Sequence, residues 1–281
     1  MYKKHEYVEE AWNAAIGASA LIMRYVKSGF DVKMKADGSP VTQADMESGR
    51  MISDWLKASG MMVLSEEEEP EGYERRRSEE WIWIVDPLDG TKEFARGGTD
   101  YTVNIGLVYG QRPVMGVIVS PATNEGWWGC EGMGAWFVQA VQEVDSMASL
   151  QKMSRAIIPT AEVGDALRIT GTRSHQTEET LRLYEIVRRH YPQSQFGSMG
   201  SSLKFCEVAS GNADVYIRTS GIHEWDTAAG DAIVRASGGA VVSLSDGLPL
   251  LYNKECLRQP SFVAAGLSTY EKLSALWPEL K

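Results

Sequence analysis

The segment from Trp81 to Phe94 constrains the fold and the chemistry of this chain more than any other part. Its first five residues are bulky and apolar and predict a buried strand, which the following proline and glycine end. Two carboxylates, Asp86 and Asp89, lie on the turn that leaves this strand. Their spacing would direct both toward one point, with the Leu88 carbonyl between them, and three such oxygens suit a hard divalent cation such as Mg²⁺.

The same turn also has the features of an anion site. Gly90 would let the backbone approach a ligand closely, and the amides from Gly90 to Lys92 would begin a short helix. Ligands for a metal ion beside amides for a phosphate favour metal-assisted phosphoryl chemistry. The alternative is that Asp-Pro and Asp-Gly pairs simply form turns, and any one such pair alone would indicate no more than that.

Taken whole, the sequence DPLDGT at 86–91 resembles the DP(I/L)DGT signature of the lithium-sensitive inositol monophosphatase superfamily. The residues Lys92–Glu93–Phe94 that follow resemble its 3'(2'),5'-bisphosphate nucleotidase branch, the CysQ type. The inositol branch usually has Thr-Asn-Phe at this place. The resemblance implies a layered α/β/α/β/α sandwich with metal ions between its halves. It extends from the first helix to about Gly239.

Length and composition fit a soluble globular protein with one large domain or two subdomains. No apolar run approaches the roughly 20 residues that cross a bilayer, and the N-terminus has no apolar signal core, so we expect neither membrane insertion nor export. The three scattered cysteines, Cys130, Cys206 and Cys256, show no metal-binding spacing and are expected to be reduced thiols. Together these features predict a cytoplasmic location.

The net charge of −10 argues against binding to polymeric nucleic acid, which requires a basic face. Solubility alone accounts for most of this charge. A small anionic substrate remains compatible with it, provided that metal ions and a few local cations offset the field. The sequence does not fix the oligomeric state, and a homodimer is an open alternative.

Apolar periodicity predicts the elements of the first half. We expect helices over 7–27 and 42–58 and strands over 30–35, 61–64, 81–85, 101–108, 112–119, 126–130 and 135–138. The hairpin signal at Tyr109–Gly110–Gln111 indicates a mostly antiparallel sheet. Val26, Met46 and Trp55 are among the helical residues expected to face the core.

The second half alternates strands with helices, which predicts an α/β subdomain whose helices cover a sheet. We expect strands over 166–170, 194–196, 215–217 and 240–242 and helices over 177–190, 201–210 and 226–237. Leu181, Tyr184 and Val187 should point inward. Because residues 144–161 carry no clear pattern, we place a boundary near them, between an N-terminal α+β subdomain (1–150) and a C-terminal α/β subdomain (151–281).

Two further motifs of the first half extend the resemblance. The sequence SPVTQAD at 39–45 is similar to S-P-V-T-x-A-D, whose Asp (here Asp45) accepts a hydrogen bond from the motif Thr (here Thr91), and that hydroxyl holds the attacking water. Alone, Asp45 would simply complement a helix dipole. The sequence LSEE at 64–67 matches a family motif whose first Glu, here Glu66, bridges metal and water. By itself, an acidic run of this kind is usually a solvated loop. Glu67 stays open as an outer or third-metal ligand, and 68–77 is expected to be mobile surface.

The third motif, WDTAAG at 225–230, contains Asp226. By itself Asp226 would cap a helix. The resemblance adds that this Asp completes a second metal site and approaches the substrate hydroxyl. It implies one cation held by Glu66, Asp86 and the Leu88 carbonyl and a second held by Asp86, Asp89 and Asp226, about 3.5–4 Å apart, to clamp the entering and leaving oxygens.

Residues that would select the substrate lie in the second half. Ser201 and Lys204 stand one turn apart at an expected helix start, which suits a phosphate. His175 and Arg218 alone carry little weight, because solitary residues of these types are usually structural or solvated. All four match positions that hold the adenosine 5'-phosphate in the nucleotidase branch, and the resemblance also places Gly90, Thr91 and Asp226 at the substrate. His223 would either join the base pocket or face water.

The resemblance therefore implies a phosphatase that uses two or three Mg²⁺ ions per site to remove the 3'-phosphate of adenosine 3',5'-bisphosphate. 3'-Phosphoadenylyl sulfate is the second substrate it suggests, and lithium inhibition is implied by the family alone. Two alternatives remain open. One is an inositol or sugar monophosphatase of the same superfamily, and the other is a nucleotide-binding regulatory protein that has lost catalysis.

Overall fold

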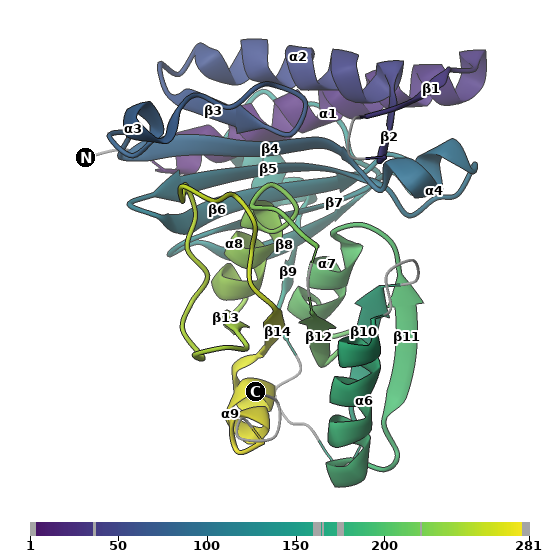
Figure 1. Cartoon of the computed structure of the whole chain (residues 1–281). Helices are drawn as coiled ribbons and strands as arrows, with labels where there is room; N and C mark the ends of the chain where they lie inside the picture. Colours follow the sequence, from purple (N-terminus) through teal and green to yellow (C-terminus); the bar gives the residue numbers. More distant parts are fainter. Residues whose placement is uncertain are drawn as a thin grey trace.

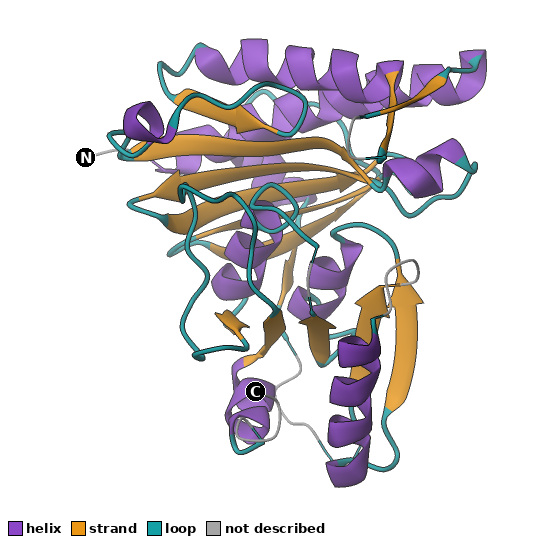
Figure 2. Ribbon diagram, viewed as in Figure 1, coloured by secondary structure: helices purple, strands orange, loops and turns teal. Residues whose placement is uncertain are grey.

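The computed structural model describes residues 4–35, 38–159, 164, 166–172, 177–219 and 221–276. Within these ranges the chain forms five layers in the order helices, sheet, helices, sheet, helices (Figures 1 and 2). This arrangement confirms the predicted α/β/α/β/α sandwich. Among the described residues, no helix combines the length and the apolar character needed to span a membrane.

The first sheet has seven strands in the described part of the chain. In spatial order they are β3 (Met62–Ser65), β4 (Trp81–Asp89), β5 (Thr102–Tyr109), β6 (Arg112–Ser120), β7 (Glu125–Cys130), β8 (Gly134–Gln139) and β9 (Arg155–Ile157). Only β3 and β4 run parallel, and the other neighbouring pairs are antiparallel, as expected. Because helices cover both faces, β4 is buried along nearly its whole length, and its residues before Asp86 form a continuous apolar run.

The helices α1 (Lys4–Ser28) and α2 (Gln43–Lys57) pack on one face of this sheet (Figure 1). A short antiparallel hairpin of β1 (Val32–Met34) and β2 (Pro40–Thr42) connects them. Helix α2 begins with a capping box, in which Thr42 accepts a hydrogen bond from the helix backbone and Asp45 accepts one from the backbone of Thr42. The box fixes Asp45 in the first turn, at the edge of the sheet where β4 ends.

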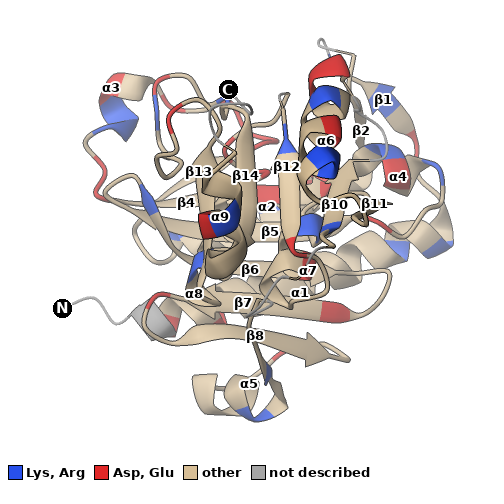
Figure 3. Ribbon diagram, turned by 90° about the horizontal axis from the view of Figure 1, so that it is seen from below, with Lys and Arg blue, Asp and Glu red and all other residues tan. Residues whose placement is uncertain are grey.

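The other face of the seven-stranded sheet packs against α7 (Leu203–Ala209) and α8 (Ala228–Ala236), which lie between the two sheets. The second sheet has the spatial order β11 (Gln195–Met199), β10 (Arg168–Thr172), β12 (Val215–Arg218), β14 (Phe262–Gly266) and β13 (Gly239–Ser243). Strands β11, β10 and β12 are parallel, and β14 is antiparallel to both of its neighbours. Helices α6 (Glu178–His190) and α9 (Leu267–Ser274) cover its outer side and carry charges of both signs (Figure 3).

Three short helices complete the described elements: α3 (Tyr73–Arg76), α4 (Thr91–Ala95) and α5 (Met147–Met153). Helix α5 and β9 occupy the region 144–161, in which the sequence showed no pattern. Strand β9 pairs with β8, so the seven-stranded sheet continues to Ile157. The division into two subdomains near residue 150 itself stays a prediction.

Several apolar side chains that the sequence placed in the core are exposed. Val26, Met46, Trp55 and Leu181 retain 43–49% of their accessible surface. In α2, Ile52 and Leu56 fill the face against the sheet, and Met46 and Trp55 lie beside that face. The apolar residues at helical spacing therefore form a stripe on each helix that is wider than the part of the helix surface covered by the sheet.

The expectation that 68–77 is mobile surface is wrong at Arg76, which is 3% exposed. Its guanidinium donates hydrogen bonds to the Glu71 carbonyl at 2.8 Å, to Asn253 Oδ1 at 2.8 Å and to the Lys254 carbonyl at 3.1 Å. Charge periodicity could not predict this, because the partners lie 177 and 178 residues further along the chain.

Close packing of α8 on β6 predicts a large penalty for a methyl group at Gly116. A Cβ atom there would lie 2.2 Å from the Ala229 carbonyl oxygen and 2.8 Å from its carbonyl carbon, both rigid backbone atoms. We expect Gly116→Ala to lower the free energy of unfolding by about 3 kcal/mol, the upper part of the usual range for overpacking. Urea denaturation measures this. In the control Gly164→Ala the new Cβ meets nothing within 4 Å, and equal stability of the two variants would refute the packing argument.

Candidate active site

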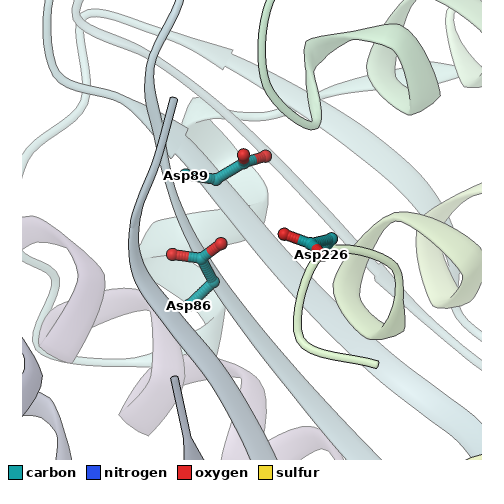
Figure 4. Close-up of side chains that lie close together, drawn as sticks. All are labelled: Asp86, Asp89 and Asp226. Carbon is teal, nitrogen blue, oxygen red and sulfur yellow. The ribbon is translucent and has the colours of Figure 1, made fainter. Parts of the chain in front are cut away.

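Three aspartates from two distant segments converge at one edge of the seven-stranded sheet (Figure 4). Asp86 and Asp89 lie at the end of β4, across an irregularity in its pairing with β5, and Asp226 lies in the turn before α8. One carboxylate oxygen from each lies within 4.8 Å of the others. The structure thus brings together residues that are up to 140 positions apart in the sequence.

The electrostatics of this cluster suit a bound cation. Burial, followed by repulsion from Glu66, Asp89 and Asp226, raises the pKa of Asp86 well above its ordinary value. Burial and the charges of Asp89 and Glu66 likewise raise the pKa of Asp226. Asp86 Oδ2 is buried and accepts no hydrogen bond from the described residues. An all-oxygen donor set with an unsatisfied carboxylate oxygen fits a hard divalent metal ion.

Glu66 lies beside this cluster, directly after β3. Burial raises the pKa of Glu66 to about 6 against the opposing effect of Lys35, and Glu67 and Asp89 raise it further. Lys35 Nζ lies 2.9 Å from Glu66 Oε1 and 2.7 Å from Glu67 Oε1, so one ammonium group bridges both glutamates. Burial lowers the pKa of Lys35, but the two carboxylates outweigh this effect and raise that pKa above its ordinary value. Glu67 is thus paired with a lysine that the sequence had not indicated.

Asp45 and Thr91 are joined by the hydrogen bond that the sequence resemblance implied. Thr91 Oγ1 donates to Asp45 Oδ1 at 2.8 Å and also lies 3.1 Å from the Leu88 carbonyl oxygen. The other oxygen of Asp45 accepts hydrogen bonds from the backbone and hydroxyl of Thr42, at 2.8 Å and 2.5 Å. Burial raises the pKa of Asp45 even though these hydrogen bonds oppose the change. The carboxylate therefore holds the Thr91 hydroxyl in one orientation.

Gly90 connects the metal-ligand candidates with α4. Its φ of +94° lies in the left-handed region, and a Cβ atom there would lie 2.6 Å from the Asp100 carbonyl oxygen. Only glycine meets both conditions without strain. The turn can therefore place the Leu88 carbonyl and Thr91 on the same cavity.

A cavity of about 220 Å³ opens over these residues. Glu66, Asp86, Leu88, Asp89, Gly90, Thr91 and Asp226 line one part of it, and Thr172, Ser201, Lys204, Tyr216 and Arg218 line another. All predicted site residues in the described part of the chain line this cavity except Asp45, which reaches it through Thr91. His175 lies outside the described residues. His223 stacks on Trp225, with ring centroids 4.7 Å apart, and is not among the residues that line the cavity.

Two local predictions need correction. Asp226 does not cap a helix, because α8 begins at Ala228 and its N-cap is Thr227; the Asp226 carboxylate instead accepts a 2.5 Å hydrogen bond from the His223 backbone. Ser201 does not start a helix either. It has a φ of +48°, and α7 begins at Leu203. The Lys204 ammonium is buried against the carbonyls of Met199 and Ser201, and burial lowers its pKa to about 8.

The protein-family model described as the inositol monophosphatase family matches residues 3–279 of this sequence. The chain belongs to the inositol monophosphatase family. Its relatives within that family include proteins named 3'(2'),5'-bisphosphate nucleotidase CysQ. The one from Shigella flexneri is 39% identical over 235 residues, which cover 83% of this chain and 87% of the relative. The one from Haemophilus influenzae is 30% identical over 254 residues and covers 89% of each chain.

Solved structures agree with this assignment. The crystal structure of CysQ from Bacteroides thetaiotaomicron, a bacterial member of the inositol monophosphatase family, superposes with a TM-score of 0.84 at 37% identity and covers 94% of this chain and 98% of that one. An inositol monophosphatase from Zymomonas mobilis has a TM-score of 0.76 at 21% identity, covering 99% and 100% of the two chains. The second comparison supports the inositol monophosphatase fold alone.

Sequence reasoning missed a pair of polar residues behind the aspartates. Ser202 Oγ donates to Asp89 Oδ2 at 2.7 Å and lies 3.2 Å from the Asp226 carbonyl oxygen. Asn104 Nδ2 donates to Ser202 Oγ at 2.8 Å and lies 3.4 Å from Asp89 Oδ2. A single amide between the apolar Val103 and Ile105 in a buried strand was the signal that could have revealed Asn104.

Proposed function

We propose that this protein is a Mg²⁺-dependent phosphatase that removes the 3'-phosphate of adenosine 3',5'-bisphosphate to give AMP and phosphate, with 3'-phosphoadenylyl sulfate as a second substrate. The observation that carries the proposal is the cluster of Asp86, Asp89 and Asp226, which lines the same cavity as Lys204 and Arg218. Carboxylates for metal ions and cations for a second phosphate suit a doubly phosphorylated small molecule. The names of the CysQ relatives support the same substrate class.

The proposed metal ligands are Glu66, Asp86, the Leu88 carbonyl, Asp89 and Asp226. Mg²⁺ held there would supply positive charge that polarises the phosphate ester and makes water more acidic. The protein's own residues then orient the reactants. Because the Thr91 hydroxyl donates its proton to Asp45, its oxygen can accept a hydrogen bond from a water molecule in the cavity. Glu66 lines the same cavity as Thr91, so its carboxylate could help to orient that water.

The opposite side of the cavity would hold the adenosine 5'-phosphate. Arg218 ends β12 and lines the cavity together with Ser201 and Lys204. Burial lowers the pKa of Lys204 to about 8, and a phosphate beside it would stabilise the charged form. We assign His175 to the same phosphate on the sequence resemblance alone. An inositol monophosphate would offer these cations no second anionic group.

Phosphate release from three substrates in Mg²⁺ tests this proposal. We expect kcat/KM to be highest for adenosine 3',5'-bisphosphate, lower for adenosine 3'-monophosphate, which lacks the 5'-phosphate, and lowest for inositol 1-phosphate. Faster turnover of inositol 1-phosphate would reject the nucleotide substrate but not the phosphatase. No phosphate release from any of the three would favour a nucleotide-binding protein without catalysis.

The pKa of Glu66 predicts an unusual pH dependence for the metal-free protein. Its folded-state value of about 6 lies above the ordinary 4.5, so the native state retains a proton that the unfolded state has released. The contribution of Glu66 to stability should therefore decrease as pH rises from about 4.5 to about 6. Urea unfolding in EDTA gives the free energies of unfolding of the wild type and of Glu66→Gln. As pH rises across that window, the wild type should lose stability relative to the variant. A difference independent of pH would contradict the prediction.

A further inference from the structure

Glu224 is a buried carboxylate that the proposed chemistry does not use. It is 0% exposed and lies two residues before Asp226. Its side chain accepts hydrogen bonds from the backbone of Asn253 at 2.5 Å and of Lys254 at 3.1 Å, and from Lys254 Nζ at 2.7 Å. Burial raises the pKa of Glu224, and Lys254 opposes that change. A buried charge with so many donors holds its surroundings in one geometry.

The backbone of the Asp226 turn is held by the same segment. Glu224 N donates to the Leu257 carbonyl at 2.9 Å, and Gln259 N donates to the Ile222 carbonyl at 2.9 Å. The Glu224 carbonyl in turn accepts a 2.9 Å hydrogen bond from the amide of Ala228, the first residue of α8. Residues 250–259, which we name the brace, thus hold the entry to the turn, and Glu224 in turn holds the start of the helix.

The brace is anchored on the far side to the first half of the chain. Asn253 and Arg76 exchange hydrogen bonds: Arg76 Nη1 donates to Asn253 Oδ1, and Asn253 Nδ2 donates to the Arg76 carbonyl, each at 2.8 Å. Both side chains are at most 4% exposed. Arg76 precedes β4, the strand that carries Asp86 and Asp89. The contacts therefore form a continuous path from the segment before β4 to the turn that carries Asp226.

We propose that Arg76, Asn253 and Glu224 are positioning residues. Their contacts set the position of the Asp226 carboxylate relative to Asp86 and Asp89. In this way they determine the affinity of the site for divalent metal ions. The inference rests on the proposed metal site. None of the three residues lines the cavity, so they act only through the turn. The Asp226 carboxylate is fixed within that turn by its hydrogen bond from the His223 backbone, at 2.5 Å.

Calorimetric titration of the full-length protein with Mg²⁺ alone tests the inference. Asn253→Gly removes the side-chain hydrogen bonds between Asn253 and Arg76 but tolerates the φ of +55° at this position. Arg76→Gln removes the guanidinium hydrogen bonds to Asn253 Oδ1 and to the Lys254 carbonyl, and keeps the one that the Arg76 backbone carbonyl accepts from Asn253. Loss of a residue that orients a metal ligand typically weakens metal binding 10–100-fold. We expect both variants to raise the Mg²⁺ dissociation constant roughly tenfold. Their kcat at saturating Mg²⁺ should stay close to that of the wild type.

A matched control separates this role from simple stabilisation. Asp214→Asn weakens a different ion pair, 2.6 Å long, between the buried Asp214 and the partly exposed Arg168 at the start of β10. We expect this variant to lose thermal stability and to bind Mg²⁺ as the wild type does. Unchanged Mg²⁺ affinity in Asn253→Gly and Arg76→Gln would overturn the positioning role and leave the proposed function intact. Absence of Mg²⁺ binding by the wild type would overturn both.

Discussion

Asp89→Asn is expected to abolish phosphate release while leaving the metal-free protein at least as stable as the wild type. Asparagine keeps an oxygen that can accept the hydrogen bond from Ser202, 2.7 Å long in the native protein, so the local structure should persist. It removes one negative charge from a cluster in which Asp89 raises the pKa values of Asp86 and Asp226. Losing a direct ligand should lower kcat by more than the roughly 100-fold that loss of an indirect partner can cost.

Opposite signs for activity and stability distinguish a metal ligand from a structural residue. Phosphate release in Mg²⁺ gives the first quantity, and thermal unfolding in EDTA gives the second. A variant that is inactive because it is unfolded would fail the second measurement. Retained activity in Asp89→Asn would refute the assignment of Asp89 as a metal ligand.

Thr91→Val should lower kcat by about 10²–10⁴-fold, the range usual for loss of a group that positions or transfers a proton. Valine has nearly the shape of threonine but cannot orient water. It also leaves Asp45 Oδ1 without the 2.8 Å hydrogen bond that Thr91 donates. The buried carboxylate would then hold its proton more tightly, because hydrogen bonds from Thr42 and Thr91 counter the effect of burial on its pKa.

Thr91→Ser is the matched control for this prediction. Serine retains the hydroxyl and its hydrogen bond to Asp45, so we expect kcat within a few-fold of the wild type. Steady-state rates at saturating Mg²⁺ and substrate compare the two variants. Equal loss of activity in both would contradict the prediction, because serine retains the hydroxyl to which the loss in Thr91→Val is attributed.

The central strand could be predicted from the sequence for physical reasons, whereas the order of the layers was implied by the family resemblance. Strand β4 is buried on both faces, so its residues are apolar without interruption until Asp86. Two carboxylates on the turn that leaves the strand, with the Leu88 carbonyl between them, have the spacing of ligands for a hard divalent cation. The hydrogen bond between Asp45 and Thr91 was implied by two motifs together, and the structure contains it. The roles assigned to these residues in catalysis stay predictions.

Features that depend on tertiary packing could not be predicted. Strand β14 and helix α9 were not assigned, because 262–274 changes directly from a short apolar strand into a helix: Gly266 is both the last residue of the strand and the N-cap of the helix. Ser202 was overlooked beside the predicted Ser201, because its partner Asp89 lies 113 residues away in the sequence. The bond between Arg76 and Asn253 joins residues 177 positions apart and has no local signal in the sequence.

Anomalous diffraction from crystals soaked with Mn²⁺ and AMP tests most directly whether these carboxylates form a metal centre. Mn²⁺ takes the same oxygen ligands as Mg²⁺ and can be located by its anomalous signal. The account predicts peaks among Glu66, Asp86, Asp89 and Asp226, with the nucleotide phosphate held by Lys204 and Arg218. Peaks only at other surface carboxylates, with this cluster free of metal at saturating Mn²⁺, would contradict it.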